Sequence, residues 1–304
     1  MDVIEIIGLT PSPIPTIYIC SFRISTKRQY KNYKYTSQEL NEIVGAFILS
    51  KNKLKVELNH PDLNLIIELV KGRAYIGYKK CLGLGGLPVG SGEKAMSLIS
   101  SGIDSPVASF KLIKRGVDVS YIHFHSYPAT SKKSIENVKD ILIKLNEYQF
   151  ESQLITVPLL EVQQQIMEVT PEKYWVILFR RMMLRVAEFF AHDNNAKVLI
   201  TGENVGQVAS QTLSNICAIS NAIDMPIIRP LAGYNKEEII SYAKEIETYN
   251  ISIKPYDDCC SYFVPTHPKT MSKINDVIEL EKKYDYIKLT RLAVESSINE
   301  VIKD

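Results

Sequence analysis

The stretch SLISSGIDSPVAS, Ser97 to Ser109, joins an apolar run to the start of a helix through a turn of serine, glycine and aspartate. Glycine lets the chain reverse sharply and exposes backbone N–H groups, and Asp104 and Ser105 are of types that cap helices. Bare N–H groups at the first turn of a helix favour an anion such as phosphate. No lysine follows the glycine, so this is not a P-loop. The stretch alone predicts either an ordinary capped turn or a phosphate-binding turn.

The segments that follow alternate between strand and helix patterns. Strands are predicted at 95–100, 118–125, 152–159 and 196–202, and helices at 104–116, 131–148 and 171–193. This alternation predicts an α/β domain, a Rossmann-like parallel sheet with helices on both faces. Such sheets bind ligands at the carboxyl ends of their strands, where SSGIDS, HFH and TGENVGQ all fall. Three polar turns at one edge favour a nucleotide site over a capped turn.

A smaller unit precedes this domain. Residues 36–49 predict a helix with Thr36 as N-cap and Glu39 completing a capping box, and strands are predicted at 53–59, 64–70 and 74–80. We therefore predict a small α+β domain over residues 1–85. The segment 81–93 holds five of the 14 glycines, which predicts a glycine-rich linker over 86–93 before a catalytic domain over 94–304.

Positive charge is concentrated in the N-terminal part. Residues 1–90 hold 12 Lys and Arg against 7 Asp and Glu, and the remainder holds 24 against 27. The densest stretch, FRISTKRQYKNYKYTS, interleaves tyrosines with five basic residues: Arg23, Lys27, Arg28, Lys31 and Lys34. Such a mixture can contact RNA through phosphates and stacked bases, or form a solvated surface with tyrosines packed beneath it.

The composition is that of a globular protein. The chain has 304 residues, 45% hydrophobic and 23% charged, and its first residues are acidic where a signal peptide carries positive charge. We expect a cytoplasmic protein without a membrane segment. The five cysteines follow no disulfide framework and form no zinc-site pattern with histidine. We expect Cys20, Cys81 and Cys217, which have hydrophobic neighbours, to fill apolar positions.

The turn resembles the Ser-Gly-Gly-x-Asp-Ser pyrophosphate loop (PP-loop) of the ATP pyrophosphatases, whose fold is adenine nucleotide alpha-hydrolase-like. Six segments in order, GLGGLPVG, SLISSGIDSPVAS, LFRRMMLRVA, TGENVGQVASQTLSN, RPLAGYNKEEI and DDCC, resemble tRNA uracil 4-sulfurtransferase, the ThiI family. KVELNHPDLNLIIEL and AYIGYKK resemble a THUMP RNA-binding domain, which favours RNA contact by the basic stretch.

The resemblance implies an ATP-dependent enzyme that adenylates the C4 oxygen of a tRNA uridine, at position 8, and replaces that oxygen with sulfur to give 4-thiouridine. Asp104 would hold Mg²⁺ and the pyrophosphate would lie in the loop, while Lys236 would steady phosphate charge. The expected ATP-binding residues are Leu98, Ile99, Ser100, Ser101, Gly102, Ser105, His123, Phe124, Arg180, Gly202 and Gln211.

The sulfur step points to the adjacent cysteines Cys259 and Cys260, because vicinal cysteines seldom serve structure and their disulfide is strained. An ungapped count from Lys236 places Cys259 on the family's catalytic cysteine, with Cys260 as the alternative. The donor would be a persulfide from a cysteine desulfurase, or sulfide. A second possibility is an iron-sulfur cluster held by Cys259, Cys260 and Cys217.

Three departures from the family pattern bear on these expectations. Ser101 stands where the family loop has glycine, which questions the turn geometry. We expect the family's N-terminal ferredoxin-like domain to be absent or vestigial, so that tRNA affinity needs a partner or a homodimer. We also expect no C-terminal rhodanese domain. The alternatives are a related enzyme that modifies another tRNA position or supplies sulfur for thiazole in thiamine biosynthesis, and an RNA-binding protein whose catalytic half has degenerated.

Overall fold

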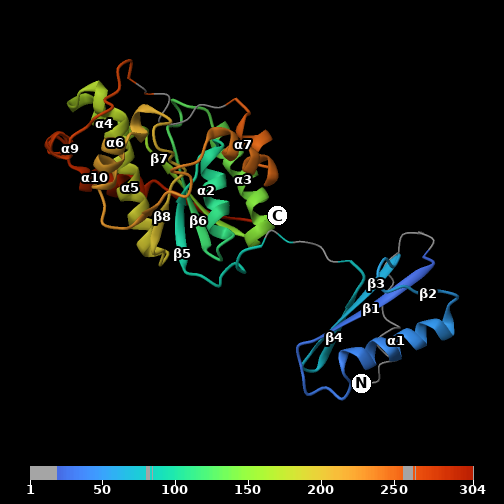
Figure 1. Ribbon diagram of the computed structural model, residues 1–304. Helices are drawn as coiled ribbons and strands as arrows, with labels where there is room; N and C mark the ends of the chain where they lie inside the picture. The colour runs from blue at the N-terminus through green and yellow to red at the C-terminus, as the bar shows by residue number, and fades with distance from the viewer. Residues whose placement is uncertain (1–18, 80–82, 84, 256–262, 264, 304) are drawn as a thin grey trace. The chain divides into compact units, whose positions relative to one another are not determined.

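The structure is a computed structural model that describes residues 19–79, 83, 85–255, 263 and 265–303 (Figure 1). The chain divides into two compact units, Met1–Gly83 and Leu84–Asp304. Each unit has its own sheet and its own hydrophobic core. The predicted linker between the two domains, residues 86–93, stays a prediction.

The first unit is a four-stranded sheet in the order β2-β1-β3-β4, with helix α1 packed against it. Strand β1 runs parallel to both of its neighbours, and β3 and β4 form an antiparallel hairpin. The predicted capping box of Thr36 and Glu39 is confirmed at the start of α1. The elements are β1 (Ser21–Arg28), α1 (Ser37–Lys51), β2 (Lys55–Val56), β3 (Leu63–Val70) and β4 (Arg73–Gly77).

Strand β1 was not among the predicted elements, yet it lies between β2 and β3. Phe22 and Ile24 alternate inward and pack with Leu40 and Val44 of α1, while the residues between them are polar. The basic stretch therefore begins as a strand, and only its continuation after Arg28 is a loop.

The second unit confirms the predicted α/β fold. Its six-stranded sheet has the order β10-β7-β6-β5-β8-β9, in which β5 to β9 are parallel. Strand β10 runs antiparallel along β7, so the predicted parallel sheet carries one antiparallel strand at this edge. The strands are β5 (Lys94–Leu98), β6 (Asp118–His125), β7 (Ser152–Pro158), β8 (Val198–Ile200), β9 (Ile227–Ile228) and β10 (Ile298–Ile302).

Helices cover both faces of this sheet because adjacent strand residues point to opposite sides. Ala95 of β5 belongs to the hydrophobic cluster that includes residues of α2, α3 and α7, and Met96 belongs to the cluster that includes residues of α4, α5, α6, α9 and α10. Figure 1 shows helices on both sides of the sheet. The longer helices are α2 (Asp104–Ile113), α3 (Lys133–Gln149), α4 (Leu160–Val169), α5 (Trp175–Asp193), α6 (Leu213–Ser220), α7 (Lys236–Glu245), α9 (Ile274–Glu281) and α10 (Tyr286–Glu295). Shorter turns are η2 (Glu172–Tyr174), η3 (Ala209–Gln211) and α8 (Tyr249–Ser252). No helix in the described part of the chain is long and apolar enough to cross a membrane.

Strand β5 lies at the point where the strand order reverses, with β6 on one side and β8 on the other. Ligands of open α/β sheets bind outside the carboxyl ends of strands at such a point. The turn after β5 and the segment after β8 therefore face the same crevice.

Gly86 and Gly92, which precede β5, lie close to the turn of residues 114–116 in the same unit. Leu87 N–H donates to the Lys114 carbonyl and Gly92 N–H to the Gly116 carbonyl, each over 2.9 Å. A Cβ at Gly86 would lie 2.0 Å from the Lys114 carbonyl oxygen, and the residue has a φ of +96°. Only glycine can adopt this positive φ without strain and also leave room for the Lys114 carbonyl.

Candidate active site

A cavity of about 230 Å³ opens at the carboxyl ends of β5, β6 and β8. All of the predicted ATP-binding residues line it except Ser101 and Gly102, and the predicted catalytic Asp104 lines it as well. The lining residues that the sequence reasoning missed are Thr201, Met183, Leu184, Glu203 and Ile219.

Serine side chains hold the turn after β5 in shape. Ser105 Oγ accepts from Ser100 N–H over 2.8 Å and donates to the Ser100 carbonyl over 3.2 Å. Behind it, Ser109 Oγ donates to the Ser105 carbonyl and lies 2.8 Å from Ser97 Oγ. The N-cap of α2 is Ile103, without a side-chain cap, so the expectation that Asp104 and Ser105 cap this helix is wrong. Ser105 instead closes the loop upstream of it.

Ser101, the departure from the family loop, is buried, and its hydroxyl has no hydrogen-bond partner in the protein. Its φ is not positive, because the non-glycine residues with positive φ in the described part of the chain are Phe150, Asn195 and Glu247. The turn therefore does not need the conformational freedom of glycine at this position.

The two predicted catalytic groups outside the cysteine pair contact each other. Lys236 Nζ lies 2.5 Å from Asp104 Oδ1, and Gln207 Nε2 donates to Asp104 Oδ2 over 3.0 Å. Lys236 is the first residue of α7, after Asn235 and its capping box. The pair brings the start of α2 and the start of α7 to one point, where a carboxylate and an ammonium group can act on the same phosphate chain.

Glu203 holds two arginines at the wall of the cavity. Its carboxylate accepts from Arg180 and Arg229 over 2.7 Å each and from Thr201 Oγ1 over 3.0 Å. Burial by itself raises the pKa of Glu203, but the charges of Arg180 and Arg229 outweigh it and keep that pKa below its usual value. Glu203 directly follows Gly202 in the TGE segment and lies between Gly202 and Gly206. This position in the predicted turn was the sequence signal that could have marked Glu203 as a site residue.

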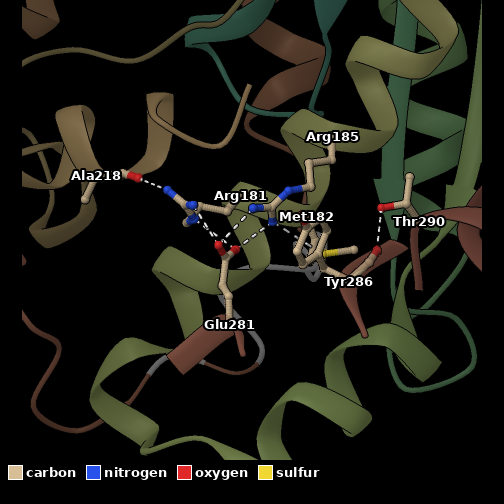
Figure 2. A network of polar contacts seen from close by, with 7 residues as sticks. All are labelled: Arg181, Met182, Arg185, Ala218, Glu281, Tyr286 and Thr290. Atoms are coloured by element: carbon tan, nitrogen blue, oxygen red, sulfur yellow. Dashed lines mark hydrogen bonds and ion pairs between the residues drawn. The ribbon is translucent and has the colours of Figure 1, made fainter. Parts of the chain in front are cut away.

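Helix α5 turns Arg180 toward the cavity because the next residue is held on another side. Arg181 is buried and donates through Nε and Nη2 to the Glu281 carboxylate of α9, and through Nη1 to the Ala218 carbonyl of α6 (Figure 2). Arg185, one turn later, donates to the same carboxylate and stacks on Tyr286 of α10. This network ties three helices to α5 and so sets the rotation of the helix that presents Arg180.

Much of the cavity lining is apolar, and a neutral histidine lies within it. His123 Nδ1 lies 2.9 Å from the Ile99 carbonyl, which assigns the ring proton to Nδ1, and Nε2 lies 3.4 Å from Ser134 Oγ. Burial lowers the pKa of His123 to about 4, and the hydrogen bond to Ile99 opposes that shift. With Leu98 and Phe124, the neutral ring offers a surface suited to a planar base.

Gly202 is required by close packing as well as by the cavity. A Cβ at this position would lie 2.7 Å from the Ser105 nitrogen and 2.8 Å from its Cα. The segment after β8 can therefore approach the first turn of α2 only because residue 202 has no side chain.

In the first unit, the predicted RNA-binding residues divide into two groups. Arg28 donates to the carbonyls of Lys31, Tyr33 and Tyr35, and Arg23 donates to Leu58 and Asn64, so both guanidinium groups hold the fold of the unit. The remaining three, Lys27, Lys31 and Lys34, are exposed.

Cys259 and Cys260 lie outside the described residues, as does Cys81. Cys20 and Cys217 are exposed, so the expectation that they fill apolar positions is wrong. On α6 it is Ala218 and Ile219 that face the core, which turns the preceding Cys217 outward. Within the described ranges no three His, Cys, Asp or Glu side chains converge as a metal site.

Comparison with known proteins agrees with this geometry. A family model described as "Thiamine biosynthesis protein (ThiI)" matches residues 90–286, and a THUMP domain model matches residues 13–79. The chain belongs to the ThiI family.

ThiI relatives align over most of this chain. The "Probable tRNA sulfurtransferase" of Thermoanaerobacter pseudethanolicus is 44% identical over 269 residues, which cover 88% of this chain and 70% of that protein. The protein of the same name from Bacillus licheniformis is 42% identical over 278 residues, covering 91% and 69%. The crystal structure of a 4-thiouridine synthetase in complex with RNA and with bound ATP is 42% identical, with a TM-score of 0.81, and covers 94% of this chain and 75% of that one.

Proposed function

We propose that this protein is an ATP-dependent tRNA sulfurtransferase that converts a uridine of tRNA, at position 8, to 4-thiouridine. The observation that carries the proposal is the cavity at the carboxyl ends of β5, β6 and β8, bordered by a serine-held turn and by the Asp104–Lys236 pair. The ThiI relatives named as tRNA sulfurtransferases, and the 4-thiouridine synthetase with RNA and ATP, give the reaction class.

The residues of the cavity suit activation of a poor leaving group. The base of ATP would lie between His123 and the apolar lining, with its phosphates at the turn Ser100–Ser105. The uracil C4 oxygen attacks the α-phosphorus and pyrophosphate leaves. Lys236 would stabilise the charge that develops on the pyrophosphate as it leaves. A sulfur nucleophile then attacks C4, and AMP departs with the former uracil oxygen.

Asp104 fits a role beside a magnesium ion that arrives with the nucleotide. Mg²⁺ is usually held by one or two carboxylates together with substrate phosphates and water, and a single carboxylate at the phosphate turn matches that pattern. When bound, the ion would neutralise phosphate charge. In the structure the Asp104 carboxylate pairs with Lys236 and accepts a hydrogen bond from Gln207. We infer that nucleotide binding rearranges the contact between Asp104 and Lys236.

We assign the sulfur step to Cys259 or Cys260, as a carrier of persulfide sulfur from a cysteine desulfurase. An iron-sulfur cluster is the alternative, for which Cys217 is accessible on α6. Anaerobic purification followed by iron and acid-labile sulfide assays decides between them. Cys259→Ser and Cys260→Ser, assayed in parallel, identify the carrier as the one whose loss stops thiolation while ATP consumption continues. Because ATP and tRNA are the substrates, we propose a cytoplasmic location.

The proposal is tested by nucleoside analysis of tRNA after incubation with the enzyme, ATP and sulfide. Asp104→Ala is expected to abolish tRNA-dependent pyrophosphate release and to leave tRNA binding unchanged, because it removes a phosphate-side group and no RNA contact. Asp118→Ala is the matched control, since Asp118 is the first residue of β6 and lies at the amino end of that strand, whereas the cavity lies at its carboxyl end. A modified nucleoside other than 4-thiouridine would point to a related thiolase. Binding of tRNA without any pyrophosphate release would identify a degenerate enzyme.

A further inference from the structure

The loop that follows β6, residues 126–132, begins and ends beside the nucleotide cavity. Before the loop, His123 and Phe124 at the end of β6 line the cavity. After the loop, Ser134 in the first turn of α3 lies with its Oγ 3.4 Å from Nε2 of His123. This β6 loop therefore lies next to the cavity at the carboxyl end of the sheet.

Two buried residues hold the β6 loop in shape. Ser126 Oγ donates to Gln163 Oε1 of α4 over 2.6 Å, and the Ser126 carbonyl accepts from Thr130 N–H over 3.1 Å. Both Ser126 and Thr130 are buried. Tyr127 lies between these two anchors and is 45% exposed. The fold therefore fixes the backbone on both sides of the Tyr127 ring without burying the ring.

Positive charge accompanies this ring. Lys132 Nζ lies 4.9 Å from the centroid of the Tyr127 ring, which is a cation–π contact. Lys132 and the next residue, Lys133, are both exposed, so their charges are available to a partner. An exposed aromatic ring beside exposed lysines suits unpaired RNA, because the ring stacks on a base and the lysines neutralise phosphates.

The reaction itself requires unpaired RNA at the edge of this cavity. The uracil C4 oxygen has to reach the α-phosphorus of ATP, and a base cannot do so while it is stacked in an RNA helix. A uridine that enters the cavity leaves the neighbouring base without one of its stacking partners. An aromatic ring fixed beside the cavity can replace that partner.

We propose that the β6 loop is an RNA-binding surface of the second unit. Tyr127 stacks on the tRNA base next to the target uridine, and Lys132 and Lys133 contact the phosphates of that stretch. The inference rests on the proposed function. It assigns to the second unit an RNA contact that is separate from the basic stretch of the first unit.

Tyr127→Leu tests the stacking, because it keeps an apolar side chain and removes the ring. With an unmodified tRNA transcript, we expect both the Kd for tRNA and the KM for tRNA in pyrophosphate release to rise about tenfold, the effect of losing one base–aromatic stack. The KM for ATP should not change. Tyr127→Phe retains the ring and should keep the wild-type values. Phe150→Leu is the matched control, because Phe150 is 80% exposed at the other end of α3.

Replacing Lys132 and Lys133 together with glutamine tests the charges. The slope of log Kd against log salt should fall in magnitude by about 0.7 for each phosphate of single-stranded RNA that is no longer neutralised. Lys197→Gln is the control, because Lys197 is exposed and directly precedes β8, at the amino end of that strand. This variant is expected to keep the wild-type slope.

Three results would overturn the inference. Equal losses in Tyr127→Leu and Tyr127→Phe would assign the effect to the hydroxyl and exclude stacking. Wild-type tRNA affinity and salt slope in all variants of the β6 loop would show that the loop does not contact RNA. Loss of 4-thiouridine with a cysteine desulfurase as donor but not with free sulfide, at an unchanged KM for tRNA, would make the loop a docking surface for the donor protein.

Direct measurement of the Kd separates this inference from the proposed function. A wild-type protein that binds tRNA without releasing pyrophosphate would refute the proposed function. A weaker Kd for Tyr127→Leu in that same protein would still support the RNA surface, and an unchanged Kd would refute both.

Discussion

At the scale of single residues, Glu203 is the acidic group on which the cavity wall depends. The residue is 7% exposed, and its carboxylate pairs with two arginines. Removing one member of a buried charged cluster leaves the others uncompensated, which costs far more than the loss of a surface pair.

Glu203→Gln is therefore expected to lower the free energy of unfolding by about 3 kcal/mol, measured by urea denaturation. Glu300→Gln serves as control, because the Lys139–Glu300 pair is partly exposed and should contribute less than about 1 kcal/mol. Equal losses of unfolding free energy in the two variants would show that the Glu203 carboxylate contributes no more to stability than a partly exposed ion pair.

His123 predicts a pH dependence. Its pKa is about 4 in the folded protein against an ordinary value of 6.5, so the unfolded chain binds the proton more readily. His123 therefore contributes up to about 3 kcal/mol to the free energy of unfolding. This contribution is complete above pH 6.5 and is lost as the pH falls from 6.5 toward 4.

The matching experiment compares unfolding free energies at several pH values between 4 and 8. His123→Asn is expected to give a shallower acid slope than the wild type, while the exposed His192→Asn retains the full slope. His125, whose pKa burial also lowers to about 4, accounts for the acid sensitivity that persists in His123→Asn. An unchanged slope in His123→Asn would contradict the assignment of a buried neutral imidazole.

At the scale of elements, the cavity depends on the close approach of two loops. The segment after β8 touches the first turn of α2 at Gly202. Gly202→Ala should push these segments apart and raise the KM for ATP about tenfold, measured from pyrophosphate release. Gly233→Ala is the control, since no atom lies within 4 Å of the added Cβ. A KM unchanged in both variants would show that the approach is not needed for nucleotide binding.

Which elements the sequence revealed follows from their patterns. The alternation around SSGIDS predicted the strands and helices that form the crevice, because buried parallel strands are continuous apolar runs. Strand β1 was missed since lysine and arginine alternate with Phe22 and Ile24, and a basic loop shows the same composition. Helix α4 and the edge strand β10 are short and mixed in polarity, so no apolar run marked them.

The site was visible in part for a related reason. Residues within one motif, such as Ser100, Asp104 and Gly202, could be named because their motifs resemble those of the ThiI family. Contacts between motifs could not, because nothing in the sequence shows that Gln207 reaches Asp104 or that Arg229 reaches Glu203. Only the strand order brings these segments together.

At the scale of the whole molecule, we expect the first unit to bind tRNA and the second unit to carry out the chemistry. The described lining of the cavity in the second unit contains the carboxylates of Asp104 and Glu203, a single arginine and no lysine, and Lys236 pairs with Asp104 from outside that lining. The first unit carries the excess of positive charge, with 12 basic against 7 acidic residues up to residue 90. We therefore expect the salt dependence of tRNA binding to come mainly from the first unit.

Replacing Lys27, Lys31 and Lys34 with glutamine tests this division, because these exposed side chains are available to phosphates. For every tRNA phosphate that is no longer neutralised, the slope of log Kd against log salt should fall by about 0.9, while the KM for ATP stays constant. Arg28→Gln is the informative comparison. Since its guanidinium holds the carbonyls of Lys31, Tyr33 and Tyr35, it should lower the unfolding temperature of the first unit, an effect the lysine variants lack. A salt slope unchanged after removal of all three lysines would move the tRNA-binding face to another surface of the protein.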